Sequence, residues 1–521
     1  MTPCAPGAGL DPASTTGKEL TVPEHTDLLV VGAGPAGIAA ALEGRRQGAV
    51  VVLVDENPVP AETMGDDIPH LFGGAMSGAA RNRTAMTEAL LAARPGLAAA
   101  FEAGVDVRLG TQCWGLYANG PSVGWLPGPV AGLADAERAG LLGFTRAVVA
   151  TGCRDMGVAF PGWDVPGVSG VLAAAALAAL GAYAPRRAVL LGSTGEAAAA
   201  LAGLRASGVE IVAVIEAAPA LVANAAAFGA PVLYGHRVVR AEGGVDGVTA
   251  LVVASAAGER RLPCDAVLLG IGAVPVIELL DAAGCRTAFD PARGGWVPVL
   301  DSVGRTSLPF IAAAGDCAGI WPAKAGHPAI AEAEGCRAAG GNAPPSTAPD
   351  GAADLAAYRM AWVQALVLDG GEDAYVCRCE EVTARDILEV RPPRYLGAAP
   401  RPRNDTSLRA LLGEGPPNPD QVKRLTRAGM GVCQGRRCRE QVACLLALGS
   451  GEPLHAVPPA THRAPVRPLP LRLAHALEEP AAMRQHWDTW FGMHSQYVPF
   501  WEAAPGYTAA GRPLDQEVAS E

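Results

Sequence analysis

The chain has 521 residues, half of them hydrophobic, and a formal net charge of −11 at pH 7. This length predicts about three domains, and the acidic balance argues against binding to nucleic acid or to an anionic membrane surface. No apolar run reaches the roughly 18 residues that a membrane-spanning helix needs.

Residues 1–25 lack the basic start and apolar core of a secretory signal, and we expect them to form a disordered arm rich in Thr, Pro and Gly. The protein is therefore expected to be cytoplasmic. Its twelve cysteines are then thiols or metal ligands rather than disulfides.

The strongest motif begins at Leu28–Val31, a short apolar run that predicts a buried parallel strand. A G-x-G-x-x-G loop follows, then a helix over 36–46 and a second buried strand over 50–54. Asp55 closes that strand about 20 residues after the loop, where a dinucleotide fold places its ribose-binding acid, and Glu56 adjoins it. This order of elements predicts a dinucleotide-binding unit rather than a Gly-rich core turn.

Each residue of this loop has its own physical role. Gly32 permits the tight turn, Gly34 lets the backbone approach a pyrophosphate, and Gly37 lets helix and strand pack closely. Pro35 and Ala36 lie at the start of the helix, whose unpaired N–H groups face the phosphates.

The segment 57–82 is predicted to be an irregular loop without cysteine. Flavoproteins that reduce disulfides carry a reactive Cys pair soon after the second strand, so we do not expect disulfide reduction. A helix is predicted over 84–103 with a break at Pro95, followed by strands of a small sheet at 105–109 and 113–117.

Another buried strand at 146–149 ends in Ala150-Thr151-Gly152, and a crossover rich in Pro and Gly follows. With the later Pro161-Gly162-Trp163 segment, this pattern resembles flavoproteins that have two dinucleotide domains. More narrowly, it resembles the α subunits of opine oxidase, hydrogen cyanide synthase and hydroxyproline dehydrogenase complexes. The resemblance implies an α/β fold with two Rossmann-like units, the first of which binds FAD through residues that include Thr151 and Gly152.

Residues 188–216 repeat the order strand, loop, helix, strand, which the family uses as its NAD(P)-type unit. Gly192 is present, but Thr194 and Ala197 occupy the second and third glycine positions. The branched side chain of Thr194 obstructs the approach of a pyrophosphate. We therefore expect this unit to be retained for architecture, with NAD(P) binding disfavoured and a loosely held adenine nucleotide left open.

Pro309–Asp316 reads PFIAAAGD and resembles the second flavin signature of the family. The resemblance implies that Asp316, after Gly315, accepts from the ribityl chain of the flavin and that a helix over 329–339 points its N-terminus at the flavin. The alternative is a strand-end turn with a solvated Asp. His327, before that helix, is expected to be structural rather than catalytic.

Four cysteines predict a second redox site. Cys377 and Cys379 are spaced C-x-C, Cys433 and Cys438 are spaced C-x4-C, and four thiolates suffice for one [2Fe–2S] cluster. The pattern resembles the bacterioferritin-associated ferredoxin module, a small helical domain. The rival interpretation is structural zinc, although zinc sites more often use C-x2-C spacing.

The surrounding residues fit a compact module. Thr383 is predicted to cap a helix, Pro419 to begin one that runs through Arg427, and Gly429 and Gly431 to end it. Residues 377–444 hold 13 Lys and Arg against 8 Asp and Glu. We expect the arginines among them to offset the charge of the cluster, with a solvated basic face as the alternative; these are Arg378, Arg436, Arg437 and Arg439.

Two stretches depart from this pattern. The insertion 391–417, rich in Arg and Pro, is expected to be a surface excursion. The end of the chain is Pro-rich over 458–470 and then carries an aromatic group that either folds back onto the same chain or anchors a partner; it comprises Trp487, Trp490, Phe491, Tyr497, Phe500 and Trp501.

The organisation expected is therefore an arm at 1–25, an FAD-binding domain at 26–155 and 296–345, an NAD(P)-like domain at 156–295, a linker and helix at 346–371, a [2Fe–2S] domain at 372–450 and a tail at 451–521.

The resemblance implies an electron-transfer α subunit of a heteromeric FAD-dependent amine or amino-acid dehydrogenase or oxidase. A flavin-containing β subunit would oxidise the C–N bond, and catalytic residues in this chain are unassigned. A small third subunit, an FMN at the interface between subunits and a downstream electron acceptor are left open. The alternatives are a standalone NAD(P)H-dependent reductase and a nucleotide-binding zinc scaffold without redox turnover.

Overall fold

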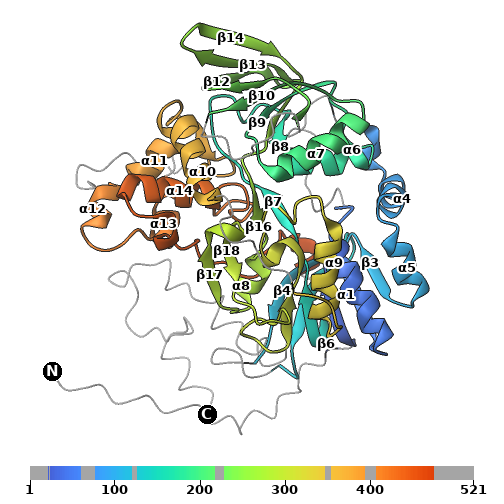
Figure 1. Cartoon of the computed structure of the whole chain (residues 1–521). Coiled ribbons are helices and arrows are strands. Elements are labelled where there is room, and N and C mark those ends of the chain that lie inside the picture. The colour runs from blue at the N-terminus through green and yellow to red at the C-terminus, as the bar shows by residue number, and fades with distance from the viewer. Residues whose placement is uncertain are drawn as a thin grey trace, which may run out of the picture.

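The computed structural model describes residues 22, 24–59, 75, 77–119, 126–217, 228–345, 354–392 and 407–474. They form two Rossmann-like α/β units and a helical module that carries the four cysteines (Figure 1). In Figure 1 the second unit, in green, lies above the first, and the orange and red module lies beside them. The mixed α/β fold predicted with two Rossmann-like units is confirmed.

The first unit is built on a seven-stranded sheet with β1 (His25–Val31) inside it, parallel to β2 (Val51–Asp55) and to β6 (Ala139–Val149). All residues of β2 are buried, as its apolar sequence predicts. The sheet is completed by β3 (Asp106–Leu109), β4 (Gln112–Tyr117), β5 (Val130–Ala134) and β19 (Ile311–Ala313). The two strands predicted near 105–117 exist, but they belong to this large sheet and not to a separate small one.

Among the helices that accompany this sheet are α1 (Pro35–Arg46), α4 (Arg83–Ala93), α5 (Gly96–Glu102) and α9 (Pro328–Ala338). The predicted break at Pro95 is confirmed, because Pro95 stands between α4 and α5. Helix α9 lies so close to α1 that a Cβ on Gly335 would come within 1.9 Å of the carbonyl oxygen of Ala36. The chain therefore returns from the second unit to pack against the first loop and its helix.

The second unit contains a five-stranded parallel sheet in the order β11 (Val232–Tyr234), β10 (Glu210–Glu216), β9 (Arg187–Leu191), β15 (Ala266–Leu269) and β8 (Val168–Gly170). Its helices are α6 (Val171–Ala179) and α7 (Gly195–Ala206). A three-stranded antiparallel sheet that the sequence patterns did not predict projects from it, made of β12 (Arg237–Gly244), β13 (Gly247–Ser255) and β14 (Gly258–Pro263).

Two antiparallel pairs and a short helix lie where the chain passes between the units. The first pair joins β7 (Cys153–Asp155), where the chain leaves the first unit, to β16 (Ala273–Pro275), where it returns from the second. The second pair is the hairpin of β17 (Thr287–Asp290) and β18 (Gly295–Pro298), preceded by α8 (Glu278–Ala282).

The module begins with α10 (Leu355–Val363), which continues as one π-helical turn, η6 (Gln364–Leu368). The cysteine-bearing part comprises β20 (Tyr375–Cys377), β21 (Val382–Thr383), α11 (Ala384–Leu388), α12 (Leu408–Leu412), α13 (Pro419–Thr426) and α14 (Arg439–Ser450). The predicted cap is confirmed, since Thr383 forms a capping box with Asp386.

Two expectations for this module need correction. Helix α13 begins at Pro419 and reaches its C-cap at Arg427, as predicted, but Arg427 itself takes the left-handed φ of 64° that was expected of a glycine. The insertion is not wholly a surface excursion, because its last part forms α12 and buries Leu408 against α14. Its residues 393–406 lie outside the described part of the chain.

The module and the second unit share one hydrophobic core, although the sequence suggested separate domains. Trp163 of the Pro-Gly-Trp segment is buried and donates its Nε1–H to the carbonyl oxygen of Tyr375 at 2.8 Å. Trp362 of α10 is fully buried in the same cluster, with Val189 from the second sheet and Leu445 from α14. The crossover 153–168 is thus the surface on which the cysteine module rests.

The described part of the tail, 451–474, returns to the first unit and ends in α15 (Leu471–Ala474). Leu473 packs in a small cluster with Trp114, and the N–H of Val466 donates to the carbonyl oxygen of Trp114 at 2.9 Å. The aromatic residues 487–501 lie outside the described residues.

Candidate functional site

The loop between β1 and α1 has the shape of a phosphate cradle. Gly32 has φ +105°, and a Cβ on it would lie 2.2 Å from the carbonyl oxygen of Ala150. A Cβ on Gly37 would lie 1.7 Å from the Gly32 oxygen, whereas a Cβ on Gly34 would meet nothing within 4 Å. Gly32 and Gly37 therefore close the loop, and Gly34 leaves an open face at the helix N-terminus, where unpaired N–H groups attract an anion.

The start of α1 keeps those groups available. Pro35 occupies the first turn, one residue earlier than predicted, and Gly34 as N-cap has no side chain to occupy the N–H groups. Ala36 is buried, and a Cβ on Gly315 would lie 3.1 Å from its Cβ. The two segments that resemble flavin signatures, 279 residues apart by numbering, therefore meet at Ala36.

Asp55 and Glu56 at the end of β2 have different surroundings. The Oδ2 of Asp55 accepts the Ala33 N–H at 2.6 Å and lies 3.1 Å from Nη1 of Arg94. Glu56 instead pairs with Arg467 of the tail, with Nε to Oε2 at 2.8 Å. Asp55 thus borders the loop directly, while Glu56 ties the tail to the first unit. The sequence did not predict Arg94 as part of this site, since no local pattern marks a residue 39 positions from its partner.

Thr151-Gly152 and Gly315-Asp316 follow two neighbouring parallel strands, β6 and β19, at the same edge of the sheet as the glycine loop. The hydroxyl of Thr151 donates to the carbonyl oxygen of Val276 at 2.8 Å, which fixes the turn after β6. Asp316 lies in a short 3₁₀ turn, η5 (Gly315–Ala318), and its Oδ2 accepts from the thiol of Cys153 at 3.2 Å. Burial, and then the Asp316 carboxylate, raise the pKa of Cys153, so this cysteine is a hydrogen-bond donor and not a thiolate.

A buried ion pair stabilises that turn by hydrogen bonds to its backbone. Nζ of Lys324 lies 2.8 Å from Oε2 of Glu334 and also donates to the carbonyl oxygens of Gly315 and Gly319. The same Glu334 oxygen accepts the N–H of Gly315 at 2.9 Å. Both side chains are buried, so the pair acts in a low dielectric and orients the backbone that presents Asp316. The sequence patterns had assigned Lys324 no role.

The four cysteines lie together as two pairs. Cys377 accepts a hydrogen bond from Cys438, and Cys433 accepts one from Cys379, which lowers the pKa of both accepting thiols. Within the described residues, no three His, Cys, Asp or Glu side chains are grouped to hold a single metal ion. Four thiolates suffice for one [2Fe–2S] cluster and also suit one tetrahedral zinc ion.

Backbone groups around the pairs complete a ligand loop. The N–H of Gly429 donates to Sγ of Cys377 at 3.4 Å, and the backbone of Arg437 and of Gly435 donates to Cys433. Such N–H···S bonds stabilise thiolate and set the potential of an iron–sulfur centre. A Cβ on Gly431 would lie 2.3 Å from the Cβ of Cys379, so this position brings the two halves of the loop together.

Arg154 connects this loop to the first site. Its Nε donates to the carbonyl oxygen of Arg436 at 2.9 Å, and its guanidinium pairs with Glu278 of α8 and Glu440 of α14. Cys153, the preceding residue, donates a hydrogen bond to Asp316. Adjacent residues of β7 therefore touch the acid of the second signature and the loop between two of the cysteines.

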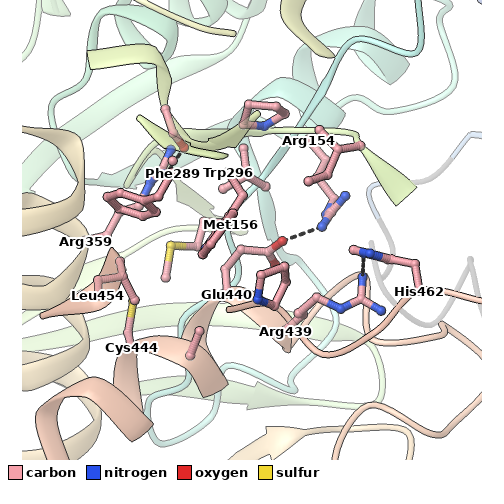
Figure 2. A pocket seen from close by; sticks show the side chains of 17 residues that line it. Arg154, Met156, Phe289, Trp296, Arg359, Arg439, Glu440, Cys444, Leu454 and His462 are labelled. Atoms are coloured by element: carbon pink, nitrogen blue, oxygen red, sulfur yellow. Dashed lines mark hydrogen bonds and ion pairs between the residues drawn. The ribbon is translucent and has the colours of Figure 1, made fainter. Parts of the chain in front are cut away.

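Figure 2 shows this junction from a neighbouring cavity of about 60 Å³, where Arg154 faces Glu440 and Arg439 faces His462. Arg359 lies at the other end of the cavity. Burial raises the pKa of Glu278, but the nearby cations, Arg154 first, outweigh burial and lower that pKa to about 2. Glu278 is thus a buried carboxylate that stays ionised among arginines.

The second nucleotide loop is occupied by the protein itself. The hydroxyl of Tyr358 in α10 donates to Oε2 of Glu216, the acid that ends β10, at 2.8 Å and accepts the N–H of Ser193 at 2.8 Å. The hydroxyl of Thr194 accepts the N–H of Ala197 and donates to the carbonyl oxygen of Gly270, so Thr194 is the N-cap of α7. Tyr358 therefore stands between the loop and the acid that a dinucleotide would bridge.

Within the described ranges, no helix is long and apolar enough to cross a bilayer.

Comparison with known proteins agrees with this architecture. A family model described as pyridine nucleotide-disulphide oxidoreductase matches residues 26–340. One opine oxidase component, from Agrobacterium tumefaciens (strain Ach5), is 29% identical over 490 residues, which cover 86% of this chain and 91% of that protein. The hydrogen cyanide synthase component HcnB of Pseudomonas aeruginosa is 28% identical, covering 85% of this chain and 97% of its own length.

Among solved structures, L-proline dehydrogenase from P. horikoshii matches with a TM-score of 0.56 and 21% identity, covering 86% of this chain and 79% of that one. At this identity the likeness concerns the fold.

Proposed function

Because the chain belongs to the pyridine nucleotide-disulphide oxidoreductase family, we propose that it is the electron-transfer component of a heteromeric flavin-dependent dehydrogenase or oxidase acting on C–N bonds. The relatives named above are subunits of opine oxidase and hydrogen cyanide synthase, and α subunits of sarcosine oxidase also match. Their substrates share a carbon–nitrogen bond, which supports this substrate class.

The first unit is proposed to hold FAD, which exchanges two electrons when bound. The open face at Gly34 and the turn at Gly315-Asp316, which meets Ala36 at the start of α1, support this assignment. The proposed binding residues are Gly32, Gly34, Pro35, Ala36, Gly37, Asp55, Glu56, Thr151, Gly152, Gly315 and Asp316.

The cysteine module is proposed to hold one [2Fe–2S] cluster, which exchanges single electrons when bound. Cys377, Cys379, Cys433 and Cys438 would supply its four thiolates. The C-x-C spacing of Cys377 and Cys379, where zinc sites more often use C-x2-C, favours the cluster over the zinc scaffold. The cations around the loop, Arg436 among them, would balance the charge of the cluster.

The main support for the proposal is that two adjacent residues, Cys153 and Arg154, contact the proposed flavin site and the cysteine loop, respectively. Cys153 donates to Asp316, and Arg154 donates to the carbonyl oxygen of Arg436 inside the ligand loop. A short, half-buried connection between two electron carriers suits a converter between two-electron and one-electron chemistry. The chain's own residues would position the two groups.

Substrate oxidation is assigned to a flavin-containing β subunit, because the opine oxidase and hydrogen cyanide synthase relatives are themselves subunits. A small third subunit, an FMN at the interface and a downstream acceptor belong to the same proposal. A standalone NAD(P)H-dependent reductase is disfavoured. The hydroxyl of Tyr358 already hydrogen-bonds to Glu216 and to the N–H of Ser193, the two groups that a nicotinamide dinucleotide would need.

Anaerobic purification followed by flavin and iron analysis tests the proposal. We expect about one FAD and two irons per chain, with a yellow-brown spectrum. Mixing with NADH should leave the flavin oxidised. A colourless preparation with zinc would contradict the relay, and prompt flavin bleaching by NADH would identify a reductase instead.

A further inference from the structure

Three exposed apolar residues, called the apolar patch below, stand in the segment 425–432 that leads into the ligand loop. Val432 is 72% exposed, and Met430 and Leu425 are 39% and 40% exposed. Val432 stands between Gly431, whose backbone contacts Cys379, and the buried Cys433. Single exposed hydrophobic residues are ordinary, but three within eight positions at a redox loop indicate an interaction surface.

A basic hollow of about 310 Å³ adjoins this patch, and Met430 forms part of its wall. Its four cations outnumber its two carboxylates, Glu278, which pairs with Arg154, and Asp420, which keeps its charge while it accepts from the backbone and hydroxyl of Thr461. The hollow therefore presents a positive surplus on a chain whose net charge is −11. The cations that line it are Lys423, Arg424, Arg439 and Arg463.

We propose that the patch of Leu425, Met430 and Val432, with its basic hollow, docks an acidic protein that carries a one-electron centre. The inference rests on the proposed function, since it assigns this partner to the cysteine module. Transient redox complexes use small interfaces, and complementary charge around them guides encounter and fixes orientation. An apolar centre over the ligand loop and a cationic border match that description for an acidic partner.

The test is a binding measurement with two redox proteins of opposite charge. Cuprous plastocyanin, which is acidic, and ferrocytochrome c, which is basic, are titrated calorimetrically into the oxidised full-length chain at low salt. We expect plastocyanin to bind and its Kd to rise with salt, because screening weakens charge pairing. Ferrocytochrome c should bind more weakly.

The matched variants are Val432→Glu and Val245→Glu. Val245 is 88% exposed in the turn between β12 and β13 of the second unit. We expect V432E to raise the Kd for plastocyanin at least about tenfold, and V245E to leave it unchanged.

Equal Kd values for the two variants, no plastocyanin binding, or equal binding of both probes would overturn the docking proposal. Iron analysis of the same samples distinguishes a failure of the docking proposal from a failure of the proposed electron relay. If the wild-type chain holds iron and V432E binds normally, only the docking surface is wrong; if the wild-type chain holds none, the relay itself is wrong.

Discussion

Nζ of Lys324 lies 2.8 Å from Oε2 of Glu334, and both groups bond to the backbone of Gly315. The pair is buried beneath the turn that presents Asp316. Removing one partner would leave the other charge buried alone, which typically costs about 3–5 kcal/mol.

This relationship predicts that Glu334→Gln lowers the free energy of unfolding by about 3 kcal/mol and weakens the binding of flavin. The measurement is chemical unfolding with flavin content after gel filtration. Glu332→Gln, an exposed position on the same helix, is the control and should match the wild type. Full flavin retention in E334Q would show that the pair does not position this turn.

The buried Glu278 predicts a pH dependence. Its pKa in the folded protein is about 2 and lies below the ordinary value of 4.5. Its stabilising contribution is therefore complete well above pH 4.5 and is lost as the pH falls toward 2. Glu278→Gln should destabilise the protein by about 3 kcal/mol at pH 7, because Arg154 loses a buried partner.

At pH 4 the difference between wild type and E278Q should shrink by about 1 kcal/mol. Urea unfolding at the two pH values measures it, with exposed Glu414→Gln as the control. A difference that grows on acidification would contradict the assignment of an ionised Glu278.

Cys433 and Cys444 provide a matched pair for the cluster. Cys433 lies in the ligand loop, whereas Cys444 lies on α14, where burial raises the pKa of its thiol to about 12. Cys433→Ser should lose most of the iron and keep flavin, because the two sites use separate residues. Cys444→Ser should keep both. Equal iron loss in the two variants would point to general unfolding rather than ligation.

Tyr358 predicts that the second nucleotide loop stays closed. Tyr358→Phe removes hydrogen bonds to Ser193 and Glu216 and should cost about 1–3 kcal/mol of stability. Tyr375→Phe is the control, since Tyr375 contributes its backbone oxygen to Trp163. Tight NADH binding by the wild-type chain in an equilibrium titration would contradict the closed loop.

The sequence was informative where chemistry is local. The first glycine loop, the break at Pro95 and the cap at Thr383 follow from neighbouring residues, and each element was predicted close to its observed bounds. The contacts that join the sites are not local. Arg154 reaches Arg436 across 282 positions, and Tyr358 reaches Glu216 across 142, so no periodicity indicates them. The shared core around Trp362 was missed for the same reason.

The measurement that tests the central claim most directly is electron paramagnetic resonance of the purified chain after anaerobic reduction with limiting dithionite, with iron and flavin determined on the same sample. The account predicts the signal of one reduced [2Fe–2S] cluster per chain alongside bound flavin, and its loss in Cys433→Ser but not in Cys444→Ser. A wild-type chain that is silent and free of iron would contradict it.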